Sequence, residues 1–452
     1  MRAAQAITEP SRQTPVFGEF DVVVLGGGPS GIAAATAAAR GGSRTLLVES
    51  YGFLGGMGTV AGVTNFCGLH ANVFGKIDQV VHGVADDLLE HMRVLGGLNE
   101  PHLVFGDRIA AQAYDNAAFK VAADQLVLGS GAQLLFHALA VGVAMRDART
   151  IDAVLIETKS GRQAVRARFF IDCSGDGDLA FHAGAAFEKG SDGHGMMYPS
   201  TMFRVNGVDP ARATEGVRQI GALMEQAQAG GRKFARKGPI VKPQKNPSEW
   251  RVNVTQLSNP DGSPVDGTVA LQLSAAEVQG RQQIVDFFDF LRSAVPGFEK
   301  AYLLEIAPQV GVRETRRVLG DYQLSETDVL QCVDFDDSIG VNGWMIEEHV
   351  AGNVALKWQD IPNCRGYNQL PWRMLLPRAM ENLLVAGRCA SMTHMGQSAA
   401  RVSGACFVMG QAAGSAASMA CEANLAPRAL DVGQLQARLQ ADGAWLGGDG
   451  AP

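Results

Sequence analysis

Residues 21–50 have the sequence DVVVLGGGPSGIAAATAAARGGSRTLLVES, and this stretch decides the fold. The apolar residues 21–25 predict a strand, and the small residues 33–40 predict a helix. Residues 46–48 predict a second strand, which ends in Glu49. A strand, a glycine-rich turn, a helix and another strand in this order are typical of a βαβ unit in a parallel sheet.

The turn after the first strand has three glycines in G-x-G-x-x-G spacing, Gly26, Gly28 and Gly31. Gly26 permits the tight turn, Gly28 lets a pyrophosphate approach the backbone, and Gly31 lets the helix pack close to the sheet. The phosphates would accept hydrogen bonds from amide groups at the start of the helix. Glu49 would accept hydrogen bonds from the hydroxyls of an adenosine ribose. The stretch therefore predicts a dinucleotide-binding site.

Length and charge limit the classes of protein. With 452 residues, the chain has room for two domains or one large composite. The hydrophobic content of 46% allows a sizeable core, and the net charge of −7 disfavours a nucleic-acid partner. The N-terminus lacks the apolar segment of a secretory signal. No run of eighteen strongly apolar residues occurs, so we expect a soluble, cytoplasmic protein with no membrane span.

The cysteine pattern argues against a metal site. The seven cysteines include no C-x-x-C pair, and their number is odd. A disulfide framework, a zinc site and an iron–sulfur cluster are therefore disfavoured, and most cysteines are expected to be small buried residues. Asp176 and Asp178 follow a predicted strand, where cofactor contacts and a helix start are a better interpretation than a metal site.

The rest of the chain alternates between expected helices and strands. Residues 132–171 alternate like an antiparallel meander, and 169–171 are continuously apolar, so they are expected to join the central sheet. Residues 231–248 form a basic, proline-punctuated loop, whose charges we expect to be solvated. Helices are predicted at 78–95, 108–128, 279–291 and 401–420, strand-like pieces at 303–319, and a further strand at 382–388 followed by a loop.

These elements predict an α/β fold in which one Rossmann-like domain is interrupted by another. The strand at 382–388 returns to the sheet after a long middle section of mixed periodicity. The predicted parts are a flexible leader at 1–19, the dinucleotide-binding domain at 20–186 and 379–424, an inserted α+β substrate domain at 187–378, and a C-terminal tail at 425–452.

Four segments together resemble a known family. They are VVVLGGGPSGIAAATAAARGGSRTLLVES with its trailing FLGGMGT, FFIDCSGDGDLA, GVRETRRVLGDY, and NLLVAGRCASMTHMGQSAARVSGACFVMGQAAGSAA. The chain resembles FAD-dependent oxidoreductases with the glutathione-reductase-type fold, in the family related to the flavin subunit of heterodisulfide reductase. It lacks the iron–sulfur cysteines of those relatives. It also lacks a second G-x-G-x-x-G between a strand and a helix, so a dedicated NAD(P)H domain is not supported.

The resemblance implies non-covalent FAD and a role for each matching residue. Glu49 would hold the adenosine ribose, Ala140 would contact adenine through its backbone, and Arg388 replaces the acid of a common Gly-Asp pair. The start of the last helix would face the pyrimidine edge of the flavin. The residues assigned to the cofactor are Gly26, Gly28, Pro29, Ser30, Gly31, Glu49, Ser50, Gly55, Gly56, Met57, Thr59, Ala140, Ser174, Gly175, Asp176, Gly387, Arg388, Ser398, Arg401 and Val402.

Three side chains are candidates for the chemistry. His394 lies in the loop before the last helix and could take a proton as hydride leaves, and His70 follows the FLGGMGT loop. Arg313 belongs to a cluster with Arg316, Arg317, Glu314 and Asp321. This cluster either binds a substrate carboxylate or forms a salt-bridge network between the domains.

The expected function is hydride transfer between a small organic substrate and flavin N5, by a dehydrogenase or an oxidase. One alternative is a flavin monooxygenase that uses external NAD(P)H. Another is a flavin subunit or binding protein that acts only with an electron-transfer partner. A homo-oligomer or an electron-acceptor protein is a possible assembly, and the sequence does not identify the substrate.

Overall fold

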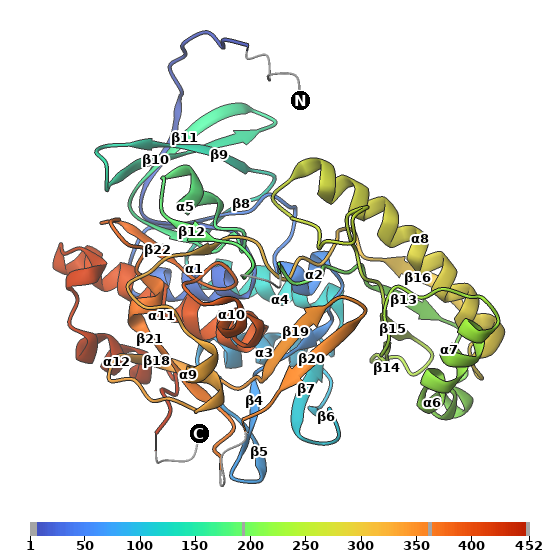
Figure 1. The fold of residues 1–452 in the computed structure, drawn as a ribbon. Helices are drawn as coiled ribbons and strands as arrows, with labels where there is room; N and C mark the ends of the chain where they lie inside the picture. Colours follow the sequence, from blue (N-terminus) through green and yellow to red (C-terminus); the bar gives the residue numbers. More distant parts are fainter. Residues whose placement is uncertain (1–6, 192–194, 360–363, 449–452) are drawn as a thin grey trace.

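The computed structural model describes residues 7–191, 195–359 and 364–448. Within them, the central element is a seven-stranded sheet in the order β8-β2-β1-β11-β10-β9, with β22 beside β11 (Figure 1). Its strands are β1 Val16–Leu25, β2 Thr45–Val48, β8 Gln133–Leu135, β9 Leu139–Met145, β10 Ile151–Thr158, β11 Gly161–Asp172 and β22 Leu383–Val385. β8, β2, β1, β11 and β22 run parallel, so the carboxyl ends of β1, β11 and β22 meet at one edge.

The predicted meander is confirmed from Leu139 onward, whereas residues 133–135 form β8, which pairs parallel with β2. β9 and β10 pair antiparallel, and β10 pairs antiparallel with the first half of β11. The second half of β11 lies between β1 and β22, with Phe170 beside Val23 and Leu383. β1 begins at Val16 rather than at Asp21, because residues 16–20 pair with 164–167, and this places the end of the predicted leader in the sheet.

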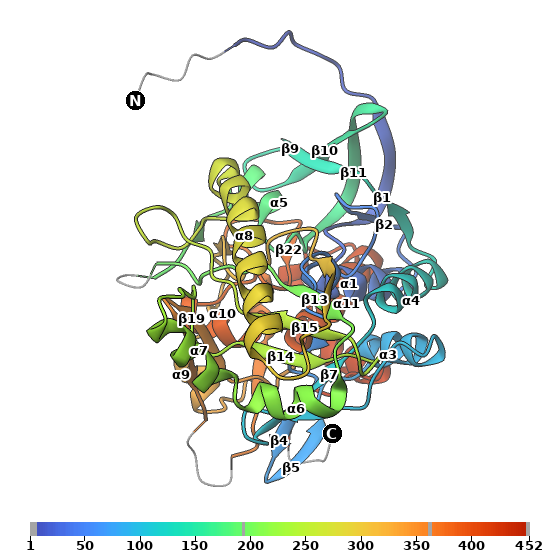
Figure 2. The same ribbon diagram turned by 90° about the vertical axis from the view of Figure 1, so that its right-hand side faces the viewer.

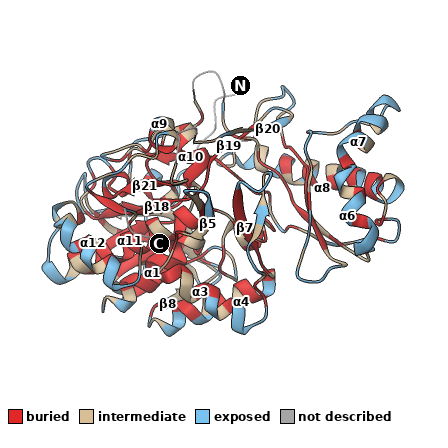
Figure 3. Ribbon diagram, turned by 90° about the horizontal axis from the view of Figure 1, so that it is seen from below, coloured by how far each residue is buried: buried red, intermediate tan, exposed pale blue. Residues whose placement is uncertain are grey.

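Two small-residue helices form the centre of the molecule. α1 (Pro29–Arg40) packs along α11 (Ser403–Ala423), and Figure 3 shows both as largely buried. A Cβ atom on Gly410 or Gly414 of α11 would overlap the backbone of Ser30 or Ala34 in α1. The small residues therefore let the two helix backbones touch, which is why the predicted helix at 401–420 is so poor in large side chains.

A second antiparallel sheet has its own core. Its order is β14-β15-β13-β16, and helices α6, α7 and α8 lie beside it (Figure 2). Its bounds are β13 Phe203–Asn206, α6 Pro210–Arg218, α7 Ile220–Ala229, β14 Ile240–Pro243, β15 Trp250–Asn253, α8 Ala270–Ala294 and β16 Tyr302–Ile306. Buried residues between Phe203 and Ala301 form a hydrophobic cluster separate from that of the central sheet.

The remainder of the middle section packs on the first core. Val318, Ile339, Ile346 and Trp372 all belong to the hydrophobic cluster of the central sheet. The elements are β12 Phe187–Glu188, β17 Arg317–Val318, α9 Glu326–Leu330, β18 Ser338–Asn342, β19 Ile346–Val350, β20 Asn353–Lys357, β21 Asn368–Pro371 and η1 Trp372–Leu375. The predicted insert at 187–378 thus divides between two cores, and its boundaries stay a prediction.

Two predicted helices are too long. Residues 76–79 form β5 (Lys76–Gln79), and α3 (Val84–Val94) starts only after Gly83, whose φ is +76°. Residues 109–113 form β7 (Ile109–Ala113), and α4 (Asn116–Gly129) starts at Asp115, whose side chain accepts a hydrogen bond from Ala118 N at 2.8 Å. The other strands on this side are β3 Asn65–Phe66, β4 His70–Val73 and β6 His102–Val104.

The C-terminal region also differs in detail. The loop predicted before the last helix contains α10 (His394–Ala400), which Thr393 caps by accepting a hydrogen bond from Gly396 N at 3.1 Å. α12 (Val432–Ala441) lies in the predicted tail and buries Leu435 and Leu439 in the first core. Among the described helices, none is long and apolar enough to cross a membrane.

Candidate functional site

The N-terminus of α1 is a turn that only glycine fits. Gly26 has φ +98°, and a Cβ atom on Gly31 would overlap the carbonyl oxygen of Gly26. Gly28 is the N-cap residue and has no side chain to cap the helix, and the first intrahelical bond runs from Ile32 N to Gly28 O. A Cβ atom on Gly28 would touch only the Cα of Gly56, at 3.7 Å. The outer face of this turn therefore has room for a phosphate.

Glu49 lies at the end of β2 with its carboxylate against the same turn. Its Oε2 accepts a hydrogen bond from Gly27 N at 2.6 Å, and its Oε1 accepts one from Ser50 Oγ at 2.9 Å. Its backbone oxygen accepts a hydrogen bond from Ala138 N at 3.1 Å, two residues before Ala140 in β9. The structure thus brings Glu49 close to the strand that carries Ala140, the other residue predicted to contact adenosine.

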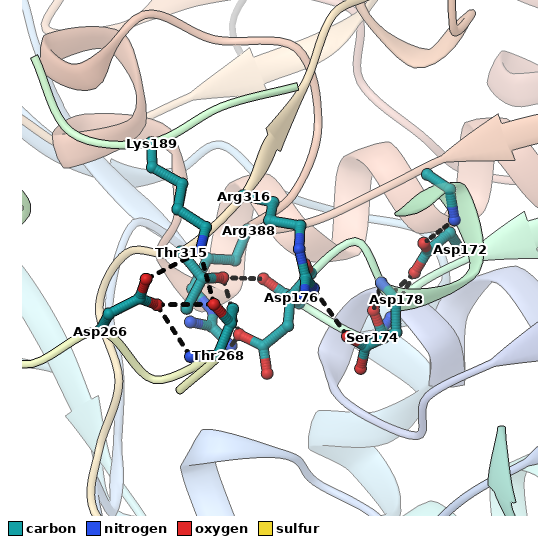
Figure 4. Close-up of polar contacts among 12 residues, drawn as sticks. Asp172, Ser174, Asp176, Asp178, Lys189, Asp266, Thr268, Thr315, Arg316 and Arg388 are labelled. Carbon is teal, nitrogen blue, oxygen red and sulfur yellow. Dashed lines mark hydrogen bonds and ion pairs between the residues drawn. The ribbon is translucent and has the colours of Figure 1, made fainter. Parts of the chain in front are cut away.

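The turns after β11 and β22 meet beside this loop. Gly387 lies against Ser30, because a Cβ atom on Gly387 would be 2.5 Å from the Ser30 hydroxyl. Arg388 Nη2 donates to Asp176 Oδ1 at 2.8 Å (Figure 4), whereas its buried Nη1 has no partner in the described residues. Ser174 Oγ donates to Asp172 Oδ1 at 2.7 Å, so it holds the turn.

The FLGGMGT loop covers the glycine turn. Gly55 N donates to Gly27 O at 2.8 Å, and Gly56 lies against Gly28. Met57 starts the short helix α2 (Met57–Val60). The Thr59 hydroxyl is buried and donates to Leu54 O at 2.9 Å, so it supports the loop from inside.

At the junction of α10 and α11, Arg401 has a side-chain group that is available for a ligand. Ser398 Oγ donates to Met395 O at 2.7 Å within α10. Val402 caps α11 without a side-chain hydrogen bond, next to Arg401. Arg401 Nη2 donates to Glu347 O at 3.3 Å, and its buried Nε has no partner among the described residues.

His394 lies between two carboxylates. Its Nδ1 is 2.8 Å from Glu314 Oε2, and its Nε2 is 3.2 Å from Glu348 Oε1. Burial lowers the pKa of His394, but both carboxylates raise it more, so its pKa lies above the usual value. A histidine with a carboxylate beside each ring nitrogen is suited to holding α10 against β19 and to keeping its proton.

His70 is separate from this group. It is buried in β4, and burial and the nearby His82 lower its pKa to about 4. Its Nδ1 has no partner in the described part of the chain. No contact between His70 and His394 is found among the described residues.

The predicted charged cluster is wrong as a single unit. Arg317 pairs with Glu314, Arg316 pairs with Asp178 at 2.9 Å, and Asp321 pairs with Arg428. Arg313 instead donates to two neutral acceptors, Tyr198 O at 2.9 Å and Ser200 Oγ at 2.8 Å. The side chains separate because consecutive residues in this extended segment face different neighbours.

Several charged residues near Arg401 were not predicted. Glu347 pairs with the buried His349, with Glu347 Oε1 3.3 Å from His349 Nε2. Alternation along β19 places both on one face, and two polar residues at i and i+2 of a strand were the available signal. Arg236 belongs to the loop expected to be solvated, yet it is 3% exposed, and Arg251 on β15 is 5% exposed. This corrects the prediction for Arg236.

Two cysteines are neighbours rather than inert core residues. Cys332 Sγ and Cys364 Sγ are 3.0 Å apart, and both are half-buried. Cys364 lines a cavity of about 380 Å³ with Arg108 and Trp358. Among the described residues, no group of three or more His, Cys, Asp or Glu side chains could hold a metal ion.

Comparison with known proteins agrees with this geometry. The sequence profile of the family described as FAD dependent oxidoreductase matches residues 21–439. The chain therefore belongs to the FAD-dependent oxidoreductase family, and its cofactor is FAD. No curated protein gives a significant match.

Solved structures with a similar course of the chain come from several flavoproteins. A geranylgeranyl bacteriochlorophyll reductase-like protein from Thermoplasma acidophilum is 15% identical, covering 94% of this chain and 83% of its own, with a TM-score of 0.46. The p-nitrophenol 4-monooxygenase from Pseudomonas putida is 11% identical, covering 95% and 89%, with a TM-score of 0.49. The anhydrotetracycline hydroxylase OxyS from Streptomyces rimosus is 13% identical, covering 94% and 65%, with a TM-score of 0.45.

Proposed function

We propose that this enzyme binds FAD non-covalently in a glutathione-reductase-type site and transfers a hydride between a small organic substrate and flavin N5. The observation that carries the proposal is the open N-terminus of α1, beside which Arg388 has a buried N–H group without a partner in the described residues. A buried guanidinium N–H and uncapped amides are groups that a pyrophosphate satisfies.

The residues fit FAD along its length. Gly26 to Gly31 and Arg388 would hold the pyrophosphate, and Glu49 the adenosine ribose. Gly55, Gly56 and Met57 would follow the ribityl chain, and Val402 would place the N-terminus of α11 at the pyrimidine edge. Positive partial charge at that helix end would stabilise negative charge on the cofactor by about 1 kcal/mol.

The flavin, when bound, supplies the atom that accepts or donates hydride. The chain must then move a proton, and two histidines lie near the junction of α10 and α11. His394 is held between Glu314 and Glu348, which suits positioning or proton donation. His349 is paired with Glu347, and burial and the charge of Arg313 lower its pKa to about 3. His349 is therefore neutral near pH 7, and Glu347 would stabilise its protonated form.

The test begins with the purified protein. We expect it to contain one FAD per chain and to release the FAD into solution when heat or acid denatures it. A flavin that precipitates with the protein would contradict non-covalent binding. Protein that stays colourless after incubation with FAD would contradict the whole proposal.

A second measurement tests the reaction class. We expect the substrate alone, without oxygen, to bleach the oxidised-flavin band. Bleaching that requires NAD(P)H, with NAD(P)H consumption stimulated by the substrate, would favour the monooxygenase alternative. Turnover only with a protein or artificial acceptor would favour the flavin-subunit alternative.

A further inference from the structure

Four arginines line the junction between the two hydrophobic cores, where the β19–β20 hairpin meets the segment after β15. Arg236, Arg251 and Arg313 are 3%, 5% and 7% exposed, and Arg401 immediately precedes the cap of α11. Guanidinium groups are almost never buried to this extent unless they are paired with an anion.

On the side of the second sheet, Arg236 is hydrogen-bonded to the strand that carries Arg251. Arg236 Nη2 donates to Asn253 O at 2.6 Å and to Asn253 Oδ1 at 3.1 Å. Asn253 is two residues after Arg251 on β15, so their side chains point to the same face of the strand. Arg251 Nη1 donates to Val63 O, three residues after α2, which places Arg251 beside the loop assigned to the flavin.

A second set of contacts connects Arg313 and Arg401. Arg313 donates to Tyr198 O, and Tyr198 N donates to His349 O at 3.1 Å. His349 pairs with Glu347, whose backbone oxygen accepts from Arg401. Arg313 also donates to Ser200 Oγ, next to Thr201, whose backbone N donates to Thr255 Oγ1 at 2.8 Å. Thr255 lies two residues after the end of β15, the strand that carries Arg251. The contacts of Arg313 and Arg401 therefore lie in the same region as those of Arg236 and Arg251.

This region has more positive than negative charge. Within the described residues, none of the four guanidinium groups has a carboxylate oxygen within 4.0 Å. Burial lowers the pKa of all four arginines, whereas the negative charge of Glu347 raises it. The N–H groups without a partner in that part of the chain are Arg236 Nε and Nη1, Arg251 Nε and Arg401 Nε. Burial lowers the pKa of Arg313, and the charges of Arg401 and Arg236 lower it further.

We infer that this arginine cluster binds the carboxylate of an organic-acid substrate beside the flavin. The inference rests on the proposed function, since it names the substrate class of the same site. A carboxylate accepts two parallel N–H bonds from a guanidinium fork, and it would neutralise charge that is now uncompensated. The pyrophosphate of FAD is a separate anion, because its predicted position is at Gly28 and Arg388 and the ribityl chain separates it from the flavin ring.

The experiment uses the FAD-loaded enzyme and carboxylate probes. Benzoate and acetate are titrated while the flavin absorption spectrum is recorded, and benzamide and acetamide serve as neutral counterparts. We expect a saturable spectral change with at least one carboxylate and none with its amide. If neither carboxylate changes the spectrum of enzyme that contains FAD, the inference is wrong although the proposed function survives. Enzyme without FAD contradicts the proposed function instead.

Variants then locate the anion site. Arg236→Gln and Arg251→Gln should raise the dissociation constant of the active carboxylate at least tenfold while FAD affinity stays within twofold. Arg232→Gln is the matched control, because Arg232 lies on the same loop as Arg236 but pairs with Asp289 near the surface. It should bind the probe like the unaltered enzyme.

Lysine variants cover the case in which a glutamine variant does not fold. Arg236→Lys and Arg251→Lys keep the charge but lose the two-point geometry, so carboxylate binding should weaken by several-fold. Unchanged carboxylate binding in folded variants at both positions would overturn the inference. If the variants lost affinity for FAD and for the carboxylate to the same extent, the inference would also be overturned, because the arginines would then bind the cofactor.

Discussion

Arg388 Nη2 donates a hydrogen bond to Asp176 Oδ1 at 2.8 Å and thereby joins the turn after β22 to the turn after β11 (Figure 4). Thr315 Oγ1 donates to the same carboxylate oxygen at 2.7 Å. The two strands are neighbours in the sheet but are separated by about half of the chain. This contact fixes the guanidinium beside the N-terminus of α1, where its second nitrogen is available to a phosphate.

The first prediction concerns this guanidinium. Arg388→Gln should weaken FAD binding by about 10- to 100-fold, because a hydrogen bond to a charged group contributes about 1.5–3 kcal/mol. Titration of the FAD-free protein, followed by quenching of flavin fluorescence, measures the change. Arg40→Gln at the other end of α1 is the control, since Arg40 is exposed and pairs with Asp87. Equal affinity in folded Arg388→Gln and the unaltered protein would exclude a phosphate contact.

The second prediction concerns the contact between α1 and α11. Gly414→Ala should lower the free energy of unfolding by about 1–3 kcal/mol, because the new methyl group would overlap the backbone of Ala34. Gly221→Ala in α7 is the matched change, since no atom lies within 4 Å of its Cβ position. It should raise stability by about 0.5–1 kcal/mol. Urea unfolding of both variants is the measurement, and equal effects would contradict the packing described here.

The third prediction concerns pH. Burial, first, and the charge of Arg313 lower the pKa of His349 to about 3, whereas the unfolded chain titrates near 6.5. Between pH 6.5 and pH 3 the unfolded chain binds a proton at His349 that the folded chain does not bind. The stability that depends on neutral His349 is therefore complete above pH 6.5 and is lost as the pH falls toward 3. Between pH 7 and pH 5 the loss should be about 2 kcal/mol.

Urea unfolding at both pH values, with His349→Gln as comparison, measures this contribution. The variant should lose less stability on acidification than the unaltered protein. His70, whose pKa is lowered to about 4, acts in the same direction and is present in both proteins. The same pH dependence in both would show that His349 takes up its proton without penalty in the folded state.

The fourth prediction concerns the thiol pair. The hydrogen bond from Cys332 lowers the pKa of Cys364 to about 6. Iodoacetamide at pH 7 should therefore modify Cys364 first, and mass spectrometry of peptides identifies the site. Cys332→Ala removes the hydrogen bond and should slow the modification about tenfold. Buried Cys389 is an internal control that should stay unmodified. Faster labelling of Cys364 in the variant would contradict the assignment.

The sequence by itself predicted the cofactor and the turn expected to bind it. The order of strand, glycine turn, helix and acid is local, and the steric demands at Gly26 and Gly31 follow from backbone geometry alone. The later returns to the sheet, at Ile171 and Leu384, were also predicted, because buried parallel strands are continuously apolar. The family match over residues 21–439 agrees with these predictions.

Only the tertiary structure decided the neighbours of the charged side chains. Arg236 looked solvated because its loop is basic, yet the second core and β15 enclose it. The cluster around Arg313 divided because Arg317 paired with Glu314 three residues away, whereas Arg313 and Arg316 found partners far along the chain. Hydrophobic periodicity predicts which face of an element is buried, but the partner of a buried charge depends on which segments meet. For this protein, that meeting brought four arginines from separate segments of the chain into one region.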